Sequence, residues 1–156
     1  MKRNYLKGMI LLLAVVLLMG GCGAKESTSE EEKQPSGPAS AAEEDEEMKM
    51  YIGEREVSVI WEENASVEEL KSLCPLKIDM SMYGGFEQIG SIGKSIARDD
   101  RQMTTESGDV VLYSGSQIVV FYGSNSWSYT RLGHVDLPEE EMAELLGNGD
   151  VVLSLE

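Results

Sequence analysis

Two groups of side chains in this chain have the residue types that bind ligands. The first group begins at Tyr83 and continues through Gly84 and Gly85 to Glu87. Paired glycines allow a backbone to approach a partner closely or to adopt positive φ, and Glu87 adds a carboxylate beside them. This segment is therefore a candidate ligand-binding turn.

The second group combines aromatic side chains with a cation. Tyr122, Trp127, Tyr129 and Arg131 lie within ten residues of one another. Aromatic faces beside a guanidinium suit the recognition of a peptide or a carboxylate. Packing in the core and at its rim explains the residue types of both groups equally well, so binding and packing both stay open.

Other catalytic and metal-binding patterns are incomplete. His134 is the only histidine, and although Asp136 is nearby, the chain has no G-x-S-x-G motif. One histidine with Cys74 does not supply a zinc ligand set, and we expect no metal and no cofactor. Residues 90–95 end like a phosphate-binding loop, but Gln88 stands where that loop requires its first glycine.

Short strands and two short helices are predicted to position these residues. From residue 48 onward the composition is that of one globular domain, with Gly53-Glu54 as a hairpin turn and residues 83–106 as an irregular glycine-rich segment. The predicted strands are 49–52, 55–61, 76–80, 110–113, 118–122, 130–135 and 151–155. Helices are predicted over 67–73, capped by Asn64 or Ser66, and from Pro138, placed in the first turn, to Leu146. These elements predict a mainly β, compact closed barrel with two short helices.

The amino-terminal residues predict export. Basic residues precede an apolar run at 9–19, which rises only about 16 Å as a helix and is too short to span a membrane. We therefore expect a signal peptide over residues 1–21. Cys22, directly after Met19-Gly20-Gly21, resembles the lipobox cysteine of bacterial lipoproteins.

That resemblance implies a lipid anchor of at least two acyl chains on Cys22, which holds a protein stably at a membrane. We expect the mature protein at the extracytoplasmic face of the cell membrane, attached through this lipid. The alternative is an ordinary signal peptide followed by a coincidental cysteine. With Cys22 lipidated, only Cys74 remains and no intramolecular disulfide is possible. Cys74 is then expected to pack as a small hydrophobe.

Residues 22–47 are predicted to form a disordered acidic linker, because they contain almost no side chains that build a core. Cleavage of the signal peptide leaves ten basic and 28 acidic residues, a net charge of −18. This charge argues against nucleic-acid binding, which needs a basic surface. It favours solubility through self-repulsion.

Five short segments of the domain follow one another in a fixed order: 83–90, 93–96, 108–113, 118–122 and 131–133. Together they resemble the small bacterial cyclophilin-like proteins over residues 48–156. The resemblance implies a compact closed β-barrel related to that of the peptidyl-prolyl isomerases. The Q-G-G-D-like segment that follows the catalytic arginine of true cyclophilins is absent, so the resemblance carries the fold but not the activity.

Three functions follow from these observations. We expect a non-catalytic module that binds a peptide, a small molecule or a partner protein through Tyr83, Gly84, Gly85, Glu87, Tyr122, Trp127 and Arg131. The first alternative is a prolyl isomerase acting on exported proteins, for which Arg131 is the available cation. The second is a structural subunit of an envelope complex.

Overall fold

The computed structural model describes residues 47–156, so the predicted signal peptide, Cys22 and nearly all of the predicted linker lie outside the described residues. No helix in the described range is long and apolar enough to cross a membrane. The elements in this range are β1 (Met50–Ile52), β2 (Arg55–Val57), β3 (Val59–Trp61), α1 (Ala65–Lys71), β4 (Leu76–Tyr83), β5 (Glu87–Ser91), β6 (Arg101–Thr104), β7 (Asp109–Tyr113), β8 (Gln117–Phe121), β9 (Ser126–Val135), α2 (Glu139–Leu146) and β10 (Val151–Leu155).

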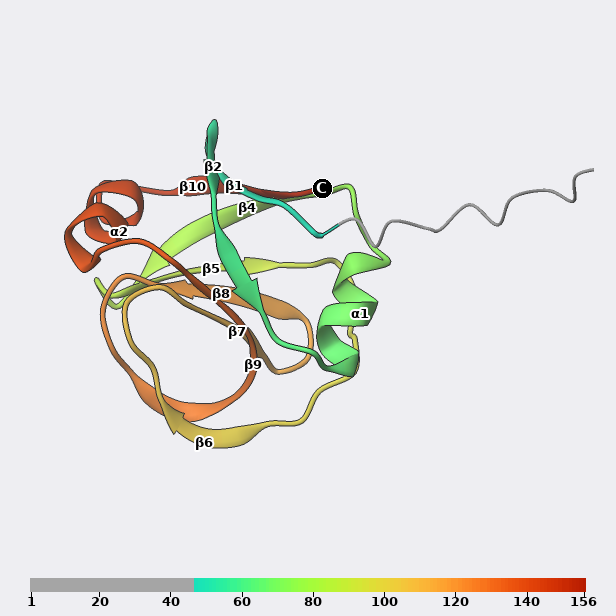
Figure 1. Ribbon diagram of the computed structural model, residues 1–156. Helices are drawn as coiled ribbons and strands as arrows, with labels where there is room; N and C mark the ends of the chain where they lie inside the picture. The colour runs from blue at the N-terminus through green and yellow to red at the C-terminus, as the bar shows by residue number, and fades with distance from the viewer. Residues whose placement is uncertain (1–46) are drawn as a thin grey trace, which may run out of the picture. The chain divides into compact units, whose positions relative to one another are not determined.

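The strands form a sheet that curls into a nearly closed barrel (Figure 1). Hydrogen-bonded neighbours follow the order β2-β1-β10-β4-β5-β8-β7-β9-β3, and β6 pairs with β9 beside this path. The two ends of the path are consecutive in the chain, because β2 ends at Val57 and β3 begins at Val59. Ser58 alone therefore joins the two edges of the sheet. The predicted mainly β barrel with two short helices is confirmed.

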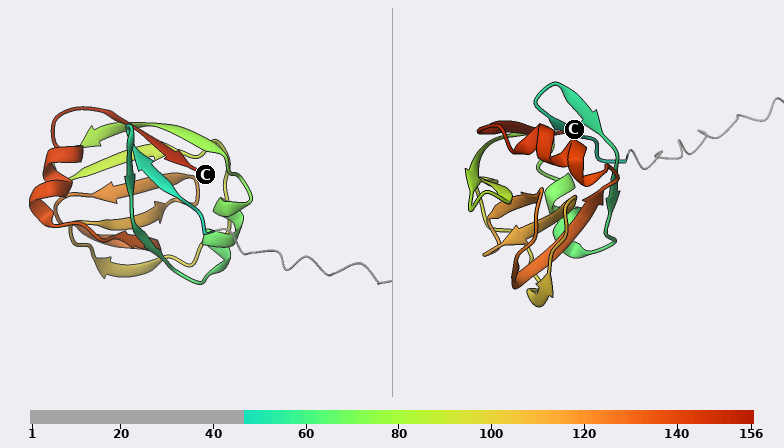
Figure 2. Two further views of the ribbon diagram at one scale, coloured as in Figure 1. Left: turned by 45° about the horizontal axis from the view of Figure 1, so that its top comes forward. Right: turned by 90° about the vertical axis from the view of Figure 1, so that its left-hand side faces the viewer.

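The two helices lie at opposite ends of the barrel (Figure 2). Asn64 caps α1, as its side chain accepts a hydrogen bond from the backbone N–H of Val67 at 3.0 Å. The Asn64 amide also donates to the carbonyl of Arg131 at 2.9 Å, which attaches α1 to β9. The helix begins and ends two residues earlier than predicted. Pro138 is the N-cap of α2 rather than part of its first turn.

The barrel interior holds the main hydrophobic core. Along β7 and β8, Val110, Leu112, Ile118 and Val120 are fully buried in this core. The alternate residues on the other face of the same strands are also buried, in a second cluster that comprises Val111, Val119, Phe121 and Tyr129. Because side chains alternate along a strand, burial on both faces explains the continuous apolar runs of β7 and β8.

The prediction of an irregular segment over residues 83–106 is wrong, because it contains strands β5 and β6. Gly90 lies inside β5, where a Cβ atom would come within 2.5 Å of the Ile78 side chain and 2.6 Å of the Met80 sulfur. The glycine here admits the side chains of β4 into the core rather than ending a strand. Its presence in the sequence therefore misleads a prediction based on turn residues.

The predicted single strand over residues 55–61 is divided at Ser58. Its first half pairs with β1, with Met50 opposite Val57, and its second half pairs with β9, with Val59 opposite Val135. Val57 and Val59 are buried whereas Ile60 is 66% exposed, so the predicted alternation continues through the break. The sequence pattern thus predicts which side chains face inward but not the exchange of partner strands.

Cys74 lies after α1, partly buried against the main core, with its sulfur 3.7 Å from the carbonyl oxygen of Leu70. Burial raises the pKa of the thiol. Since the thiolate is the reactive form, this position favours packing over reactivity, in agreement with the sequence-based expectation.

Candidate functional site

The candidate ligand-binding residues do not form a single site. Tyr83, Glu87 and Trp127 line one groove, whereas Arg131 lines another. Tyr122 packs in the barrel core with 9% of its surface exposed. Gly84 and Gly85 form the β4–β5 turn with φ of +64° and +74°, and they shape the hairpin rather than line either groove.

The groove that contains Tyr83 and Trp127 has a volume of about 380 Å³ and lies over the second hydrophobic cluster. Four of its lining side chains are aromatic, and we name it the aromatic groove. Its lining residues are Tyr83, Glu87, Ile89, Tyr113, Gln117, Val119, Asn125, Trp127 and Tyr129. Grooves of this size that are mostly apolar and carry a few polar groups are typical of small-ligand sites.

Strand pairing positions the rim of the aromatic groove. The β4–β5 hairpin places Tyr83 opposite Glu87, and the β6–β9 pair places Trp127 opposite Met103. The side chains of Tyr83 and Trp127 are 65% and 57% exposed. Two large exposed aromatic side chains therefore border one groove, an arrangement common at binding surfaces.

Tyr129 is the buried aromatic side chain of the groove. Its ring meets Phe121 and Tyr113 edge to face, with centroids 5.7 and 6.0 Å apart. Its hydroxyl accepts a hydrogen bond from the Asn125 amide at 3.0 Å. These contacts fix the Tyr129 ring, so this wall of the groove is preorganised.

Glu87 is the acidic residue of the aromatic groove, and only 5% of it is exposed. Its Oε2 atom is fully buried, and no donor within residues 47–156 reaches it. Burial raises the pKa of this carboxyl. The pKa of Tyr122 and of Tyr129 is also raised, mainly by burial and to a smaller extent by the negative charge of Glu87. A buried carboxylate without a partner is energetically unfavourable, which makes Glu87 a functional candidate.

Gln88, the next residue, has a structural role. Its side chain points to the other face of β5, is fully buried, and donates to the carbonyl oxygens of Leu146 and Gly149, both at 2.7 Å. These bonds hold the loop between α2 and β10 against the barrel. Gln88 is therefore a structural residue.

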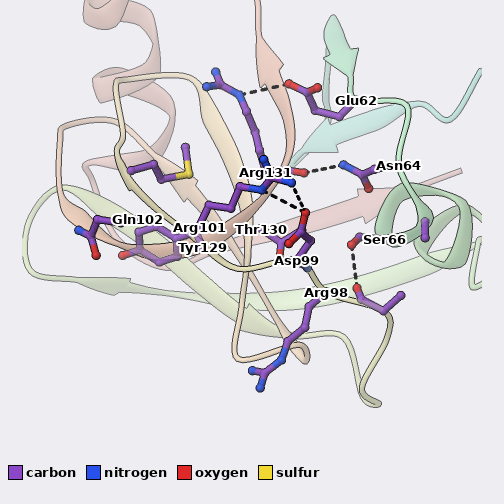
Figure 3. Close-up of a pocket in the computed structure, with 13 residues that line it drawn as sticks. Glu62, Asn64, Ser66, Arg98, Asp99, Arg101, Gln102, Tyr129, Thr130 and Arg131 are labelled. Carbon is purple, nitrogen blue, oxygen red and sulfur yellow. Dashed lines mark hydrogen bonds and ion pairs between the residues drawn. The ribbon is translucent and has the colours of Figure 1, made fainter. Parts of the chain in front are cut away.

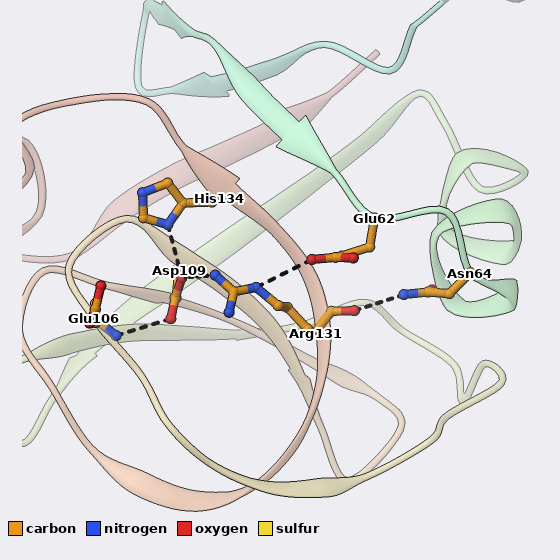
Figure 4. A network of polar contacts seen from close by, with 6 residues as sticks. All are labelled: Glu62, Asn64, Glu106, Asp109, Arg131 and His134. Carbon is orange, nitrogen blue, oxygen red and sulfur yellow. Dashed lines mark hydrogen bonds and ion pairs between the residues drawn. The ribbon is translucent and has the colours of Figure 1, made fainter.

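Arg131 belongs to a network centred on Asp109 (Figure 4). The Asp109 carboxylate is 2% exposed and accepts from Arg131 Nη2 at 2.6 Å. It lies 2.9 Å from His134 Nδ1 and accepts from the backbone N–H of Glu106 at 3.0 Å. Glu62 lies 3.4 Å from Arg131 Nε on the opposite side. The guanidinium is thus held by two carboxylates.

The groove that contains Arg131 has a volume of about 490 Å³ and is lined by three arginines, and we name it the arginine groove (Figure 3). Arg101 pairs with Asp99 at 2.6 Å, and Arg98 pairs with Asp100 at 3.4 Å. Asp99 and Asp100 are therefore each paired with an arginine. Since each arginine faces a carboxylate, this groove has no excess of positive charge with which to attract an anion.

His134 has a different acidic neighbour from the one its sequence position suggests. Its Nδ1 atom contacts Asp109, whereas the backbone N–H of Asp136 donates to Ser58. Among the described residues, no group of three or more His, Cys, Asp and Glu side chains could hold a metal ion.

Several residues of the aromatic groove were missed by sequence reasoning. Tyr113 lines it from β7, Gln117 and Val119 line it from β8, and Asn125 lines it from the loop before β9. A signal was present, because Tyr113 and Val119 occupy the alternate positions of strands that were correctly predicted. Identifying them also requires the register between β5 and β8, in which Ile89 lies opposite Val119.

The comparison with known families decides the identity of the domain. Residues 50–156 match the sequence model of the cyclophilin-like family. The chain belongs to the cyclophilin-like family. The match covers every strand and helix of the described structure, and it confirms the resemblance found in the sequence. None of the curated proteins compared with the chain matches it.

Proposed function

We propose that this cyclophilin-like protein is a non-catalytic binding module whose ligand site is the aromatic groove. The observation that carries the proposal is the buried, unpartnered carboxylate of Glu87 within a groove bordered by the exposed rings of Tyr83 and Trp127. A groove of about 380 Å³ suits a small molecule or one or two side chains of a peptide.

The arrangement of Arg131 argues for binding rather than prolyl isomerisation. An arginine that assists isomerisation must present its guanidinium to the substrate, and here Asp109 and Glu62 engage two of its nitrogens. The groove beside Arg131 also contains Arg98 and Arg101, each with its own acidic partner. The aromatic groove, by contrast, combines apolar walls with a single charged residue.

Ligand titration of the purified full chain tests the proposal, with one pool of tetrapeptides and one pool of small amines, carboxylates and neutral metabolites as probes. We expect a saturable change in the fluorescence of Trp127, since its half-exposed ring borders the groove. Trp61 contributes a constant background, because its indole N–H is bonded to the Met48 carbonyl at 2.7 Å outside the groove. Tyr83→Ala should weaken the binding about tenfold or more, through loss of one aromatic wall.

Ile60→Ala is the matched control for Tyr83→Ala, because Ile60 is a large exposed hydrophobic residue that does not line the aromatic groove. Its binding curve should overlay that of the unchanged protein. The proposal fails if neither pool changes the fluorescence, or if the two variants weaken binding equally.

We further propose that the module is displayed on the extracytoplasmic face of the cell membrane through a lipid on Cys22. The support is the sequence alone: a basic start, a short apolar run and small residues before the cysteine. Cys22→Ala should move the protein from the membrane pellet to the soluble fraction, since acyl chains supply the membrane affinity. Cys74→Ala, which changes the only other cysteine, should leave the protein in the pellet. Retention of the Cys22→Ala protein in the membrane would contradict the anchor.

A further inference from the structure

We infer that the aromatic groove selects organic cations that carry N–H groups, such as a primary ammonium or a guanidinium. The inference rests on the proposed binding function and adds the chemical class of the ligand. It depends on one juxtaposition: the carboxylate of Glu87 lies among the rings of Tyr83, Tyr113, Trp127 and Tyr129.

The charge of the groove has one source. Of the nine lining residues, Glu87 is the only acidic one, and the remaining polar members are Gln117, Asn125 and the tyrosine hydroxyls. No lysine or arginine lines the groove to neutralise Glu87. A cation that enters supplies the missing counter-charge in surroundings of low dielectric, where the attraction is stronger than in water.

Hydrogen bonding further narrows the ligand class. The Glu87 carboxylate has no hydrogen-bond donor among residues 47–156, and its Oε2 atom is buried, so a ligand that carries N–H groups would donate to the part of the carboxylate that lines the groove. A quaternary ammonium has no such donor and gains only the electrostatic part. We therefore expect primary ammonium and guanidinium groups to bind more tightly than quaternary ones.

The aromatic walls strengthen the preference for cations over neutral ligands. Ring faces attract cations through their quadrupoles, and four aromatic side chains line this one groove. The formal net charge of the whole chain is −15, so its long-range field attracts cations and repels anions. The groups that line the groove and the overall charge of the chain thus both favour a positively charged ligand.

Titration of the purified full chain with matched probes tests the inference. The cationic probes are n-butylammonium and N-acetyl-lysine methylamide, which represent a free amine and a peptide side chain. The neutral probe is N-acetyl-norleucine methylamide, and tetramethylammonium tests the need for N–H groups. We expect the two primary ammonium probes to bind at least about tenfold more tightly than the other two.

Glu87→Gln should weaken n-butylammonium binding about tenfold or more, because it removes the charge and keeps the side-chain shape. Glu54→Gln is the matched control, since Glu54 is exposed in the β1–β2 turn, outside the groove, and its substitution should leave binding unchanged. Affinity of the unchanged protein should also fall as the pH is lowered through the raised pKa of Glu87, because protonation removes the counter-charge. Burial, followed by the charge of Glu87, raises the pKa of Tyr129, so its hydroxyl stays neutral over this acidic range.

The outcomes separate the inference from the proposed function. Equal binding of the neutral and cationic lysine analogues, or unchanged affinity in Glu87→Gln, overturns the cation selectivity while a binding groove remains. Binding of only one of the two primary ammonium probes supports the selectivity and identifies the source as free amine or peptide. Absence of any saturable response to these probes, together with a response to anionic or neutral members of the metabolite pool, overturns the inference alone. No response to any probe overturns both.

Discussion

Asp109→Ala is expected to lower the free energy of unfolding by about 3 kcal/mol, because it removes a buried acceptor that three groups share. Arg131, His134 and the backbone N–H of Glu106 would each lose a bond to a carboxylate that is 2% exposed. For a domain of this size the loss corresponds to a fall in Tm of about 10 °C. Thermal or urea unfolding followed by circular dichroism measures it.

Asp99→Ala provides the matched control for Asp109→Ala. Both aspartates pair with an arginine at 2.6 Å, but the side chains of Asp99 and Arg101 are 72% and 79% exposed. Water replaces the lost interaction at such a site, so we expect no measurable change in Tm. Equal destabilisation by the two substitutions would show that burial does not determine the strength of the Asp109 network.

Gln88→Met is expected to lower the free energy of unfolding by about 2 kcal/mol, since methionine keeps the length of the side chain and removes its donors. The carbonyl oxygens of Leu146 and Gly149 would lose their 2.7 Å bonds from Gln88 Nε2. Urea unfolding gives the change, and hydrogen exchange locates it at the end of α2 and the start of β10.

Glu87→Met, the same substitution one residue earlier, should have the opposite sign. It removes a buried carboxylate that has no partner among residues 47–156, so it should stabilise the domain at pH 7. The folded-state pKa of Glu87 is raised by burial, so the unfavourable effect of its charge is fully present above that pKa. It declines as the pH falls through the folded pKa and is absent below the unfolded value, and the difference between the two proteins should narrow accordingly. Destabilisation by Glu87→Met at pH 7 would contradict the conclusion that the buried Glu87 carboxylate has no partner.

Local patterns predicted most of the fold. The β1–β2 turn and strand β10 lie where they were predicted, and the cap is Asn64, one of the two predicted residues, because turn residues, caps and alternation act over a few neighbours. The prediction of an irregular segment over residues 83–106 failed because glycine has two structural roles. Gly84 and Gly85 turn the chain, whereas Gly90 makes room for Ile78 and Met80 inside a strand. Only the three-dimensional neighbours distinguish these uses.

The candidate site was predicted in part, since the strands bring together residues that are distant in sequence. Tyr83, Glu87 and Trp127 were identified from residue type and share a groove, but Tyr122 faces the core and Arg131 turns toward Asp109. The partner of Arg131 lies 22 residues away and is set by the β7–β9 pairing, which includes a register shift between Val110 and Val111. A bulge of this kind changes which side chains share a face, and no local pattern in the sequence records it.

The single-residue connection at Ser58 between β2 and β3 affects how readily copies of the protein associate at high concentration. β2 and β3, which end the path of paired strands, are only three residues long, and β6 beside this path has four. The carbonyl of Ser58 accepts from the backbone N–H of Asp136 at 3.0 Å. Edges this short offer few unpaired backbone groups to a strand of a neighbouring copy. We therefore expect the domain to pair edge to edge with neighbouring copies less readily than an open sheet built from the same strands would.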